Sequence, residues 1–290
     1  MSIIKSKYSM GINKVLNYIQ TNIDEKLSLK DLSNIAGFSP YHFHRIFSAN
    51  VGESLNSYIK RVKLDNSALK LKYTNENIAD IAISCGYEST SAYAKAFKQE
   101  FKITPSDFRE KTTTKNDSYM VQLEKICKES FLGIKEFNDT QILFTQSFGP
   151  YRKVFDEAWN ELFSFTSKKN LINEETQFIA ICLDDPEITA KEKLRYQACI
   201  TYSGKDIQED NFAIKTIPGG KYAAFRHKGP YETFYKTYDA ALIYWFQENY
   251  EKVIFDFEIL RDTPCFEVLN PNFLNTKPDD LITDIYIPIE

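Results

Sequence analysis

Histidine and cysteine are the residues of this sequence best suited to bind a metal or to attack a substrate. His42 and His44 lie two residues apart in a stretch with helical periodicity, so they do not share one face of a helix. The five cysteines are widely scattered and form no CxxC pair, which argues against a zinc site or a disulfide framework. His227 has no acidic partner in its local sequence, and no nucleophile–base pair is visible. We therefore expect no metal, no cofactor and no catalytic residue, and the free thiols favour a reducing, cytoplasmic location.

Charge is divided unevenly along the chain. Residues 1–115 contain 17 Lys and Arg against 11 Asp and Glu, and the rest of the chain holds 19 and 29 of the totals of 36 and 40. A basic half suits a polyanion and an acidic half suits a cation, although ordinary solvated faces would give the same balance. No apolar run approaches the roughly 20 residues that span a bilayer, and the N-terminus lacks the apolar core of a secretion signal. We expect no membrane association.

Two pairs of short helices are predicted in the basic half, and they must position its polar side chains. Ser28 is a favourable N-cap for a helix that ends at Gly37, a residue that reaches positive φ without steric cost. We expect Ser39 to cap a second helix that has Pro40 at its first position. Apolar residues recur at helical spacing on one side of this helix, and Tyr41, His42, His44 and Arg45 occupy positions outside this apolar stripe.

The same pattern returns about 50 residues later. Residues 78–86 form a short predicted helix that ends at Gly86, and residues 88–101 form a longer one. Residues 53–73 read as one long basic helix between the two pairs. Two short helices joined by a glycine turn, with polar residues on the second, are the arrangement that places a recognition helix in a major groove. The sequence predicts an all-α domain over residues 8–112 that binds double-stranded promoter DNA.

This half resembles the AraC/XylS family of transcription regulators. Residues 37–71 and 78–110 look like its two helix-turn-helix halves and end in its F-x-x-x-F-x-x-T/S-P-x-x-F/Y-R signature. The resemblance implies base contacts from the first recognition helix by Tyr41, His44 and Arg45, and from the second by Ser91, Ala92 and Lys95. It implies phosphate contacts by Lys60, Arg61 and Lys63.

The resemblance leaves alternatives open for these side chains. Arg45 could read guanine in bidentate fashion, worth about 1–3 kcal/mol of discrimination, or be an ordinary surface arginine. Tyr41 and His44 could instead pack on sugar or be solvated, and Lys95 could contact phosphate. Ala92 offers only a methyl group, so we expect the second recognition helix to discriminate less.

The acidic half contains an internal duplication behind a polar linker at 113–119. GPY motifs begin at Gly149 and Gly229, and each is preceded by a strand-like segment and followed by an amphipathic helix that leads to further strands. We therefore expect residues 120–290 to form an α+β domain built from two β-helix-β-β units, with a ligand-binding cleft between them.

This half is similar to the GyrI-like, or Rob-type, effector-binding domain. The resemblance rests on IPGGKYAAFRHKGPYE, YDAALIYWF, LRDTPCFEVLNP and LITDIYIPI. It implies a pocket for lipophilic cations with aromatic walls and a buried carboxylate, which maps onto Glu267. A second acidic position maps onto Asp284 with Tyr286, although the family usually has Glu where Asp284 stands.

Strand alternation and aromatic content extend this expected pocket. Leu269 should share a strand face with Glu267, and Tyr286 should share one with Asp284. Tyr151 and Trp159 are candidate aromatic walls, with core packing as the alternative for Trp159.

The leading hypothesis is a one-component regulator that binds promoter DNA through residues 8–112 and a small, lipophilic cationic effector through residues 120–290. RNA polymerase is a further partner that such a regulator could contact. One alternative keeps the DNA reader and lets the rear domain dock a protein partner. The other makes the rear domain a GyrI-like hydrolase in which Glu267 would act as general base; we expect the chain not to be an enzyme.

Overall fold

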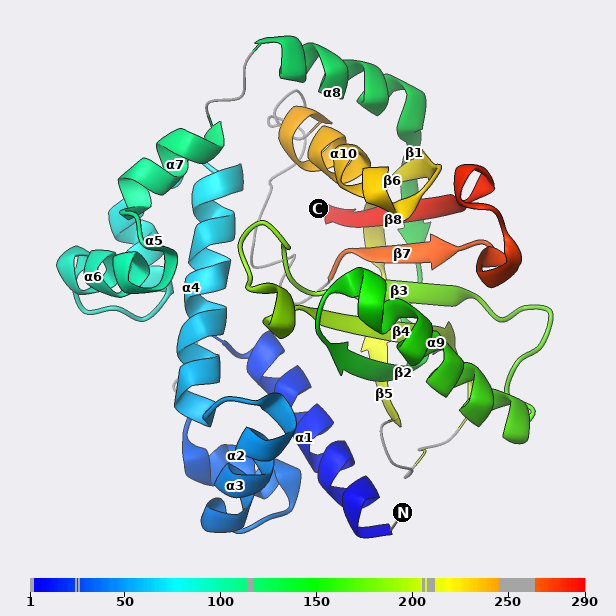
Figure 1. Ribbon diagram of the computed structural model, residues 1–290, viewed down its shortest axis with the longest axis horizontal. Coiled ribbons are helices and arrows are strands. Elements are labelled where there is room, and N and C mark those ends of the chain that lie inside the picture. The colour runs from blue at the N-terminus through cyan, green and yellow to red at the C-terminus, as the bar shows by residue number, and fades with distance from the viewer. Residues whose placement is uncertain are drawn as a thin grey trace. The chain divides into compact units, whose positions relative to one another are not determined.

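The computed structural model describes residues 3–23, 25, 27–113, 117–204, 207, 212–245 and 264–289. The chain divides into two compact units (Figure 1). The first unit contains Met1–Lys115 and, by its contacts, also Asp184–Ala190. The second unit holds most of the remaining chain, from Asn116 onward.

All regular secondary structure in the described part of the first unit is helical, as predicted. Its helices are α1 (Ile3–Thr21), α2 (Leu29–Ala36), α3 (Pro40–Val51), α4 (Leu55–Tyr73), α5 (Ile78–Ser84), α6 (Thr90–Phe101) and α7 (Pro105–Thr113). The long helix α4 contacts α3 of the first helix-turn-helix pair and both α5 and α6 of the second. Figure 1 shows α4 running between the two pairs. The two helix-turn-helix units therefore share one connecting helix.

The predicted turn and cap residues set the ends of these helices. The hydroxyl of Ser28 accepts a hydrogen bond from the backbone N–H of Asp31 at 3.1 Å, as an N-cap does. Gly37 and Gly86 adopt φ values of 73° and 78°, in the left-handed region that favours glycine. Ser39 has an extended conformation but makes no side-chain cap bond, so this helix start relies on Pro40.

Each helix-turn-helix pair has its own aromatic core. Phe43 and Phe47 are fully buried in the first, and the ring of Phe47 lies 5.6 Å from that of Tyr58 on α4. In the second, Tyr93 is fully buried and donates a hydrogen bond to Ser67 of α4 at 3.0 Å. Both cores thus close against the same helix.

The second unit begins with a helix that the sequence did not suggest. Its helices and strands are α8 (Asp117–Ser130), β1 (Phe131–Phe137), β2 (Thr140–Phe148), α9 (Tyr151–Lys168), β3 (Phe178–Cys182), η1 (Lys191–Lys193), β4 (Arg195–Thr201), β5 (Phe212–Ile217), β6 (Gly220–Lys228), η2 (Tyr231–Thr233), α10 (Phe234–Asp239), the π-helical η3 (Ala240–Trp245), β7 (Phe266–Leu269), η4 (Phe273–Asn275), η5 (Pro278–Asp280) and β8 (Ile282–Ile289). α8 is easily missed, because among its described side chains only Leu123, Cys127 and Ser130 are buried.

The strand order confirms the duplication. One eight-stranded antiparallel sheet runs β1-β6-β8-β7-β3-β4-β2-β5, and exchanging β1–β4 for β5–β8 reproduces this order in reverse. The two copies meet at the β7–β3 pair. Each copy also gives its first strand to the other, because β1 pairs with β6 and β5 pairs with β2.

Helices cover one face of the sheet. Helix α9 packs over the first copy, where Trp159 lies among Leu143, Ala198 and Leu269. α8, α10 and η3 pack over the second copy, where Trp245 lies against Phe225. The opposite face has a separate apolar cluster that includes residues such as Phe144, Ile181 and Phe266.

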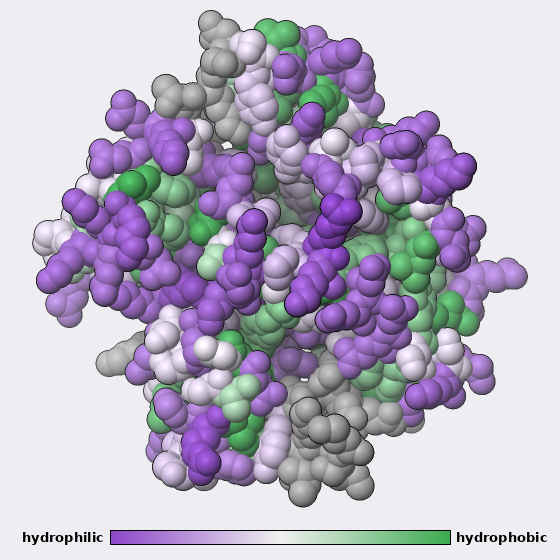
Figure 2. Space-filling view, in the orientation of Figure 1, coloured by the Kyte–Doolittle hydropathy of each residue, from purple (hydrophilic) through white to green (hydrophobic). Residues whose placement is uncertain are grey.

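No helix in the described ranges is long and apolar enough to cross a membrane. The face drawn in Figure 2 is covered mostly by hydrophilic side chains.

Candidate DNA-binding face and effector site

Helix α3 exposes the side chains that the sequence assigned to base contacts. Tyr41 is 76% exposed, and His44 and Arg45 are also exposed, whereas Phe43 and Phe47 on the other side are fully buried. The guanidinium of Arg45 lies 5.9 Å from the centre of the Tyr41 ring, within the range of a cation–π contact. The core therefore fixes which side of α3 is free to enter a groove.

His42, beside these residues, has a packing role. Its ring makes edge contacts with Phe38 at 5.7 Å and with Tyr8 at 5.3 Å. These contacts join α3 to α1 and to the turn before it.

Helix α6 presents its predicted positions in the same way. Ser91, Ala92 and Lys95 are exposed, while Tyr93 and Phe97 are buried. Ser89 caps the helix by accepting a hydrogen bond from the Ala92 N–H at 3.2 Å. Both candidate recognition helices thus keep a polar side uncovered.

The three basic residues expected at phosphates lie in different surroundings. Lys60 is exposed and Lys63 is half-buried. Arg61 is only 7% exposed, and its guanidinium forms ion pairs with Glu53 at 2.9 Å and Asp65 at 3.0 Å. This placement corrects the expectation for Arg61, because a buried guanidinium with two carboxylate partners is not available to a phosphate.

Burial and pairing act in opposite directions on Arg61. Burial lowers the pKa of the guanidinium, but the hydrogen bond with Glu53 and the charges of Asp65 and Glu53 outweigh it and raise the pKa. Its side chain is therefore part of the internal structure of the helical unit.

In the second unit, Glu267 is a buried carboxyl group on β7. It is 2% exposed, and its Oε1 accepts a 2.5 Å hydrogen bond from the hydroxyl of Tyr238 on α10. The thiol of Cys182 on β3 lies 3.9 Å from Oε2. Within the described ranges, Glu267 forms no ion pair.

The surroundings of Glu267 favour its neutral form. Burial raises the pKa of the carboxyl group to about 7, and the hydrogen bonds from Tyr238 and Cys182 offset only part of this effect. A buried charge without a partner is costly, so a cation that reached Glu267 would supply an interaction that the protein lacks.

Tyrosines from separate elements surround this carboxyl group. Tyr238 and Tyr196 both have pKa values well above 10, because burial is reinforced by nearby groups that include Glu267. Burial likewise raises the pKa of Tyr231 to about 12. Phe155 lies between two of these rings, 5.8 Å from Tyr196 and 5.3 Å from Tyr231. Aromatic rings and un-ionised hydroxyl groups thus border Glu267.

The predicted aromatic and apolar residues extend from this site into the core. Trp159 is fully buried and donates a hydrogen bond from Nε1 to the Tyr196 hydroxyl at 2.9 Å. Leu269 is 3% exposed and belongs to the same apolar cluster as Trp159. Tyr151 is half-buried, with its ring 6.1 Å from that of Tyr196. Trp159 therefore packs as core and also holds a tyrosine of the site.

Asp284 and Tyr286 lie on the other face of the sheet. In the antiparallel register Glu267 is opposite Ile285, whereas Asp284 is opposite Val268, so their side chains point to opposite faces. Asp284 forms a bidentate ion pair with Arg226 at 2.7 and 2.8 Å. Tyr286 stacks on Phe266 at 5.0 Å. This corrects the expectation that these two residues join Glu267 in one pocket.

Sequence reasoning did not single out Tyr238, Tyr196 or Cys182. A signal for Tyr238 exists in the duplication, because the GPY motifs begin at Gly149 and Gly229 and equivalent positions pair Tyr238 with Ala158. The second copy thus has a tyrosine where the first copy has an alanine, and this difference marks Tyr238 as a residue with a role beyond packing.

Metal binding has no support in the described residues. No group of three or more His, Cys, Asp or Glu side chains there could hold a metal ion.

Family models match both parts of the chain. A model described as a GyrI-like small molecule binding domain matches residues 133–290, more than half of the sequence. A helix-turn-helix domain model matches residues 32–111.

Relatives match over the helical part. An uncharacterized HTH-type transcriptional regulator, YbfP of Bacillus subtilis, is 38% identical over 117 residues, which are 39% of this chain and 40% of YbfP. The multiple antibiotic resistance protein MarA of Escherichia coli is 36% identical over 101 residues, 35% of this chain and 80% of MarA. The chain thus spans less than half of YbfP, the relative whose name describes a transcriptional regulator.

Solved structures show weaker likeness. The EcmrR C-terminal domain covers 55% of this chain and 98% of its own, with 17% identity and a TM-score of 0.42. EcmrR in a DNA complex covers 90% of this chain and 98% of its own, with 14% identity and a TM-score of 0.47. By the match of residues 133–290 the chain belongs to the GyrI-like family, and a helix-turn-helix domain precedes this small-molecule binding domain.

Proposed function

We propose that the chain is a transcription regulator that binds promoter DNA and senses a lipophilic cation, and that Glu267 is the group that binds the charge of this cation. The observation that carries the proposal is a carboxyl group that is 2% exposed and has no ion-pair partner among the described residues. The alternative role for Glu267 is a purely structural hydrogen bond with one tyrosine hydroxyl. A side chain without an ionisable group could fill that role equally well.

The physical chemistry favours a cation over an anion or a neutral ligand. A cation would stabilise the ionised carboxylate, whose pKa burial has raised to about 7. Aromatic faces such as those of Phe155 and Tyr231 can add cation–π attraction of about 0.5–2 kcal/mol each. An anion would meet Glu267 as a like charge.

For the DNA-binding domain we propose that α3 reads bases and that α6 contributes less. Arg45 is the exposed residue on α3 best suited to guanine, and Tyr41 and His44 flank it. On α6 we assign Lys95 and Ser91 to polar contacts and Ala92 to a methyl contact. Lys60 and Lys63 are the proposed phosphate contacts.

A titration with tetraphenylphosphonium, a lipophilic monocation, tests the effector proposal. The whole chain should bind it, and Glu267→Gln should lower the affinity tenfold or more, since the amide keeps the shape and removes the charge. Asp284→Asn is the matched control, because it neutralises a carboxylate on the opposite face and should change the affinity less than twofold.

Triphenylphosphine oxide, a neutral molecule of similar shape, separates charge from size. It should bind weakly to the wild-type chain and should not discriminate between wild type and Glu267→Gln. Equal affinities of the two variants for tetraphenylphosphonium would remove Glu267 from the proposed site.

A further inference from the structure

Residues Asp184–Ala190 lie in the connection between β3 and β4, two neighbouring strands of the sheet in the second unit. By their contacts, however, these seven residues belong to the DNA-binding unit. We call them the clasp segment. It is continuous in sequence with one unit and packs as part of the other.

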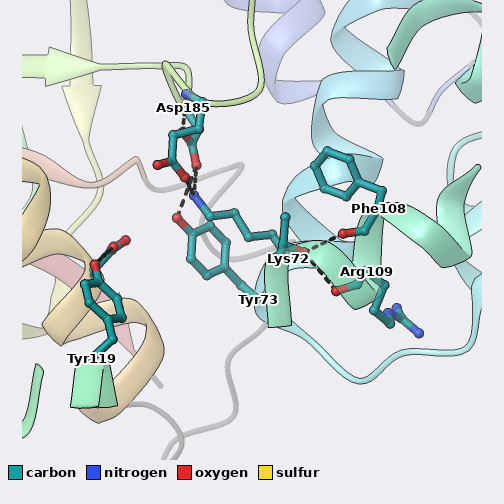
Figure 3. A network of polar contacts seen from close by, with 9 residues as sticks. Lys72, Tyr73, Phe108, Arg109, Tyr119 and Asp185 are labelled. Atoms are coloured by element: carbon teal, nitrogen blue, oxygen red, sulfur yellow. Dashed lines mark hydrogen bonds and ion pairs between the residues drawn. The ribbon is translucent and has the colours of Figure 1, made fainter. Parts of the chain in front are cut away.

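The clasp segment binds the end of α4 through two acidic side chains. The ammonium of Lys72 forms ion pairs with Asp185 at 2.8 Å and with Glu187 at 2.7 Å. The hydroxyl of Tyr73 donates a further hydrogen bond to Asp185 at 3.1 Å. Figure 3 shows Lys72 and Tyr73 both reaching Asp185.

Lys72 is buried in its contact with Asp185 and Glu187. Its side chain is 4% exposed. Burial lowers the pKa of its ammonium, but the charges and hydrogen bonds of Asp185 and Glu187 outweigh burial and raise it. Without them, the buried ammonium of Lys72 would have no acidic partner.

The clasp segment also reaches the middle of α4. The hydroxyl of Thr189 donates a 2.9 Å hydrogen bond to Asp65, the residue that also pairs with Arg61. Ile188 packs against the apolar cluster formed by residues such as Leu64. Seven residues therefore hold α4 from Asp65 to Tyr73.

The strand that leads into the clasp segment carries a residue that contacts Glu267. Cys182 is the last residue of β3, and its thiol lies beside Glu267. One residue, Leu183, separates it from Asp184, and the N–H of Leu183 still bonds to the Arg195 carbonyl at 3.1 Å. A change in β3 at Cys182 would thus reach the clasp segment within a few residues.

We propose that the clasp segment carries the effect of the ligand from the Glu267 site to α4, and through α4 to the spacing of the recognition helices α3 and α6. The inference rests on the proposed function, because it needs an effector site at Glu267 that influences DNA binding. α4 suits the role, since the aromatic cores of both helix-turn-helix units close on it through Tyr58 and Ser67.

The ion pairs and hydrogen bonds between the clasp segment and α4 favour a contact that can be broken and re-formed over a permanent one. A buried ion pair adds little stability compared with apolar packing, and its best-attested use is to fix one arrangement among several. Directional bonds from Lys72, Tyr73 and Thr189 exist in one position of the segment and are lost together when it moves. Coupling between sites requires an element of this two-state kind.

A mutant cycle tests the proposal without any ligand. DNA affinity is measured on a DNA site selected with the wild-type chain, for wild type, Glu267→Gln, Asp185→Asn/Glu187→Gln, and the triple combination. Glu267→Gln should change the dissociation constant for DNA about fivefold or more with the clasp segment intact, and less than twofold when its two charges are removed. Glu192→Gln, on η1 just outside the segment, is the charge-matched control and should leave the effect of Glu267→Gln intact.

A second background guards against loss of folding. Removing both acids leaves Lys72 buried and unpaired, so Lys72→Met is added to Asp185→Asn/Glu187→Gln to delete the whole ion-pair group. Amide exchange of residues 61–73 should be faster than in wild type in this background, and the Glu267 effect on DNA should again vanish. Glu267→Gln changing DNA affinity equally in all backgrounds, or in none, would overturn the proposal.

Tetraphenylphosphonium then separates this inference from the proposed function. If the cation binds and shifts DNA affinity equally in wild type and in the clasp variants, the effector function stands and the clasp segment is not its route. If the cation fails to bind wild type, the ligand assignment fails, and the mutant cycle alone decides the coupling.

Discussion

The hydroxyl of Tyr238 lies 2.5 Å from Oε1 of Glu267 and donates a hydrogen bond to it. Tyr238 is on α10 and Glu267 is on β7, so the bond ties the helix of the second repeat to the strand at the centre of the sheet. The pKa of Tyr238 is well above 10, so its proton stays in place at neutral pH. One buried proton donor thus supports one buried carboxyl group.

The first prediction concerns pH and stability. Burial raises the pKa of Glu267 from 4.5 to about 7, so its neutral form is favoured in the folded chain. Its contribution to stability is complete below pH 4.5 and is lost as pH rises to 7. The loss has an upper limit of about 3 kcal/mol.

Thermal or urea unfolding of the whole chain, compared between wild type and Glu267→Gln from pH 5 to 8, measures this loss. The difference between the two should grow in favour of the variant as pH rises. A constant difference across the range would mean that Glu267 ionises as freely in the folded chain as in water.

The second prediction concerns the proton donor. Tyr238→Phe removes a hydrogen bond that lowers the pKa of Glu267, so the carboxyl group should ionise at higher pH. Affinity for tetraphenylphosphonium should fall several-fold at pH 7 and recover toward the wild-type value at pH 9. Tyr235→Phe, at an exposed position on the same helix, is the control and should leave the pH profile unchanged. A loss that is the same at both pH values would point to packing instead.

The third prediction concerns base reading. Arg45→Ala should weaken specific DNA binding by about 1–3 kcal/mol and relax the preference at one base pair. Competition binding against every single-base variant of the selected site measures both effects. Lys60→Ala should weaken all sites alike and reduce the salt slope by about one, as a phosphate contact does. An equal loss of affinity for all of these sites on Arg45→Ala would show that Arg45 contacts phosphate and does not read a base.

The fourth prediction concerns the second helix-turn-helix core. Phe97 is fully buried against Phe101 and Phe108, so Phe97→Ala should cost about 3–5 kcal/mol of stability in this domain. Lys98→Ala, the exposed neighbour, should change stability by less than about 0.5 kcal/mol. Circular dichroism melts of the whole chain provide the measurement, and an early helical transition should appear for Phe97→Ala alone.

Much of the fold followed from local spacing in the sequence. Ser28, Gly37 and Gly86 end or begin helices because of their own backbone and side-chain chemistry, and the structure confirms them. The duplication was visible because the GPY motif occurs twice. Such features depend on a few neighbouring residues and need no knowledge of distant contacts.

Features set by long-range register were harder to predict. Glu267 and Asp284 each sit on a strand with clear alternation, but the face of each strand depends on pairing with its neighbour, and one residue of shift reverses it. Arg61 is a different case, because Asp65 lies one helical turn away and Glu53 only eight residues away, so these ion pairs are local in sequence. The clasp segment leaves no local pattern, because Lys72 and Asp185 are far apart in sequence.

The exchange of first strands between the two repeats has a consequence for how this domain folds. β1 completes the sheet of the second copy and β5 completes that of the first, so neither copy has its full set of backbone partners alone. The two halves must therefore form together as one cooperative unit, and neither can be cut out as an independent module. Within such a unit the two equivalent helices can still differ in role. Ala158 of α9 only packs in the core, whereas the equivalent Tyr238 of α10 donates a hydrogen bond to Glu267.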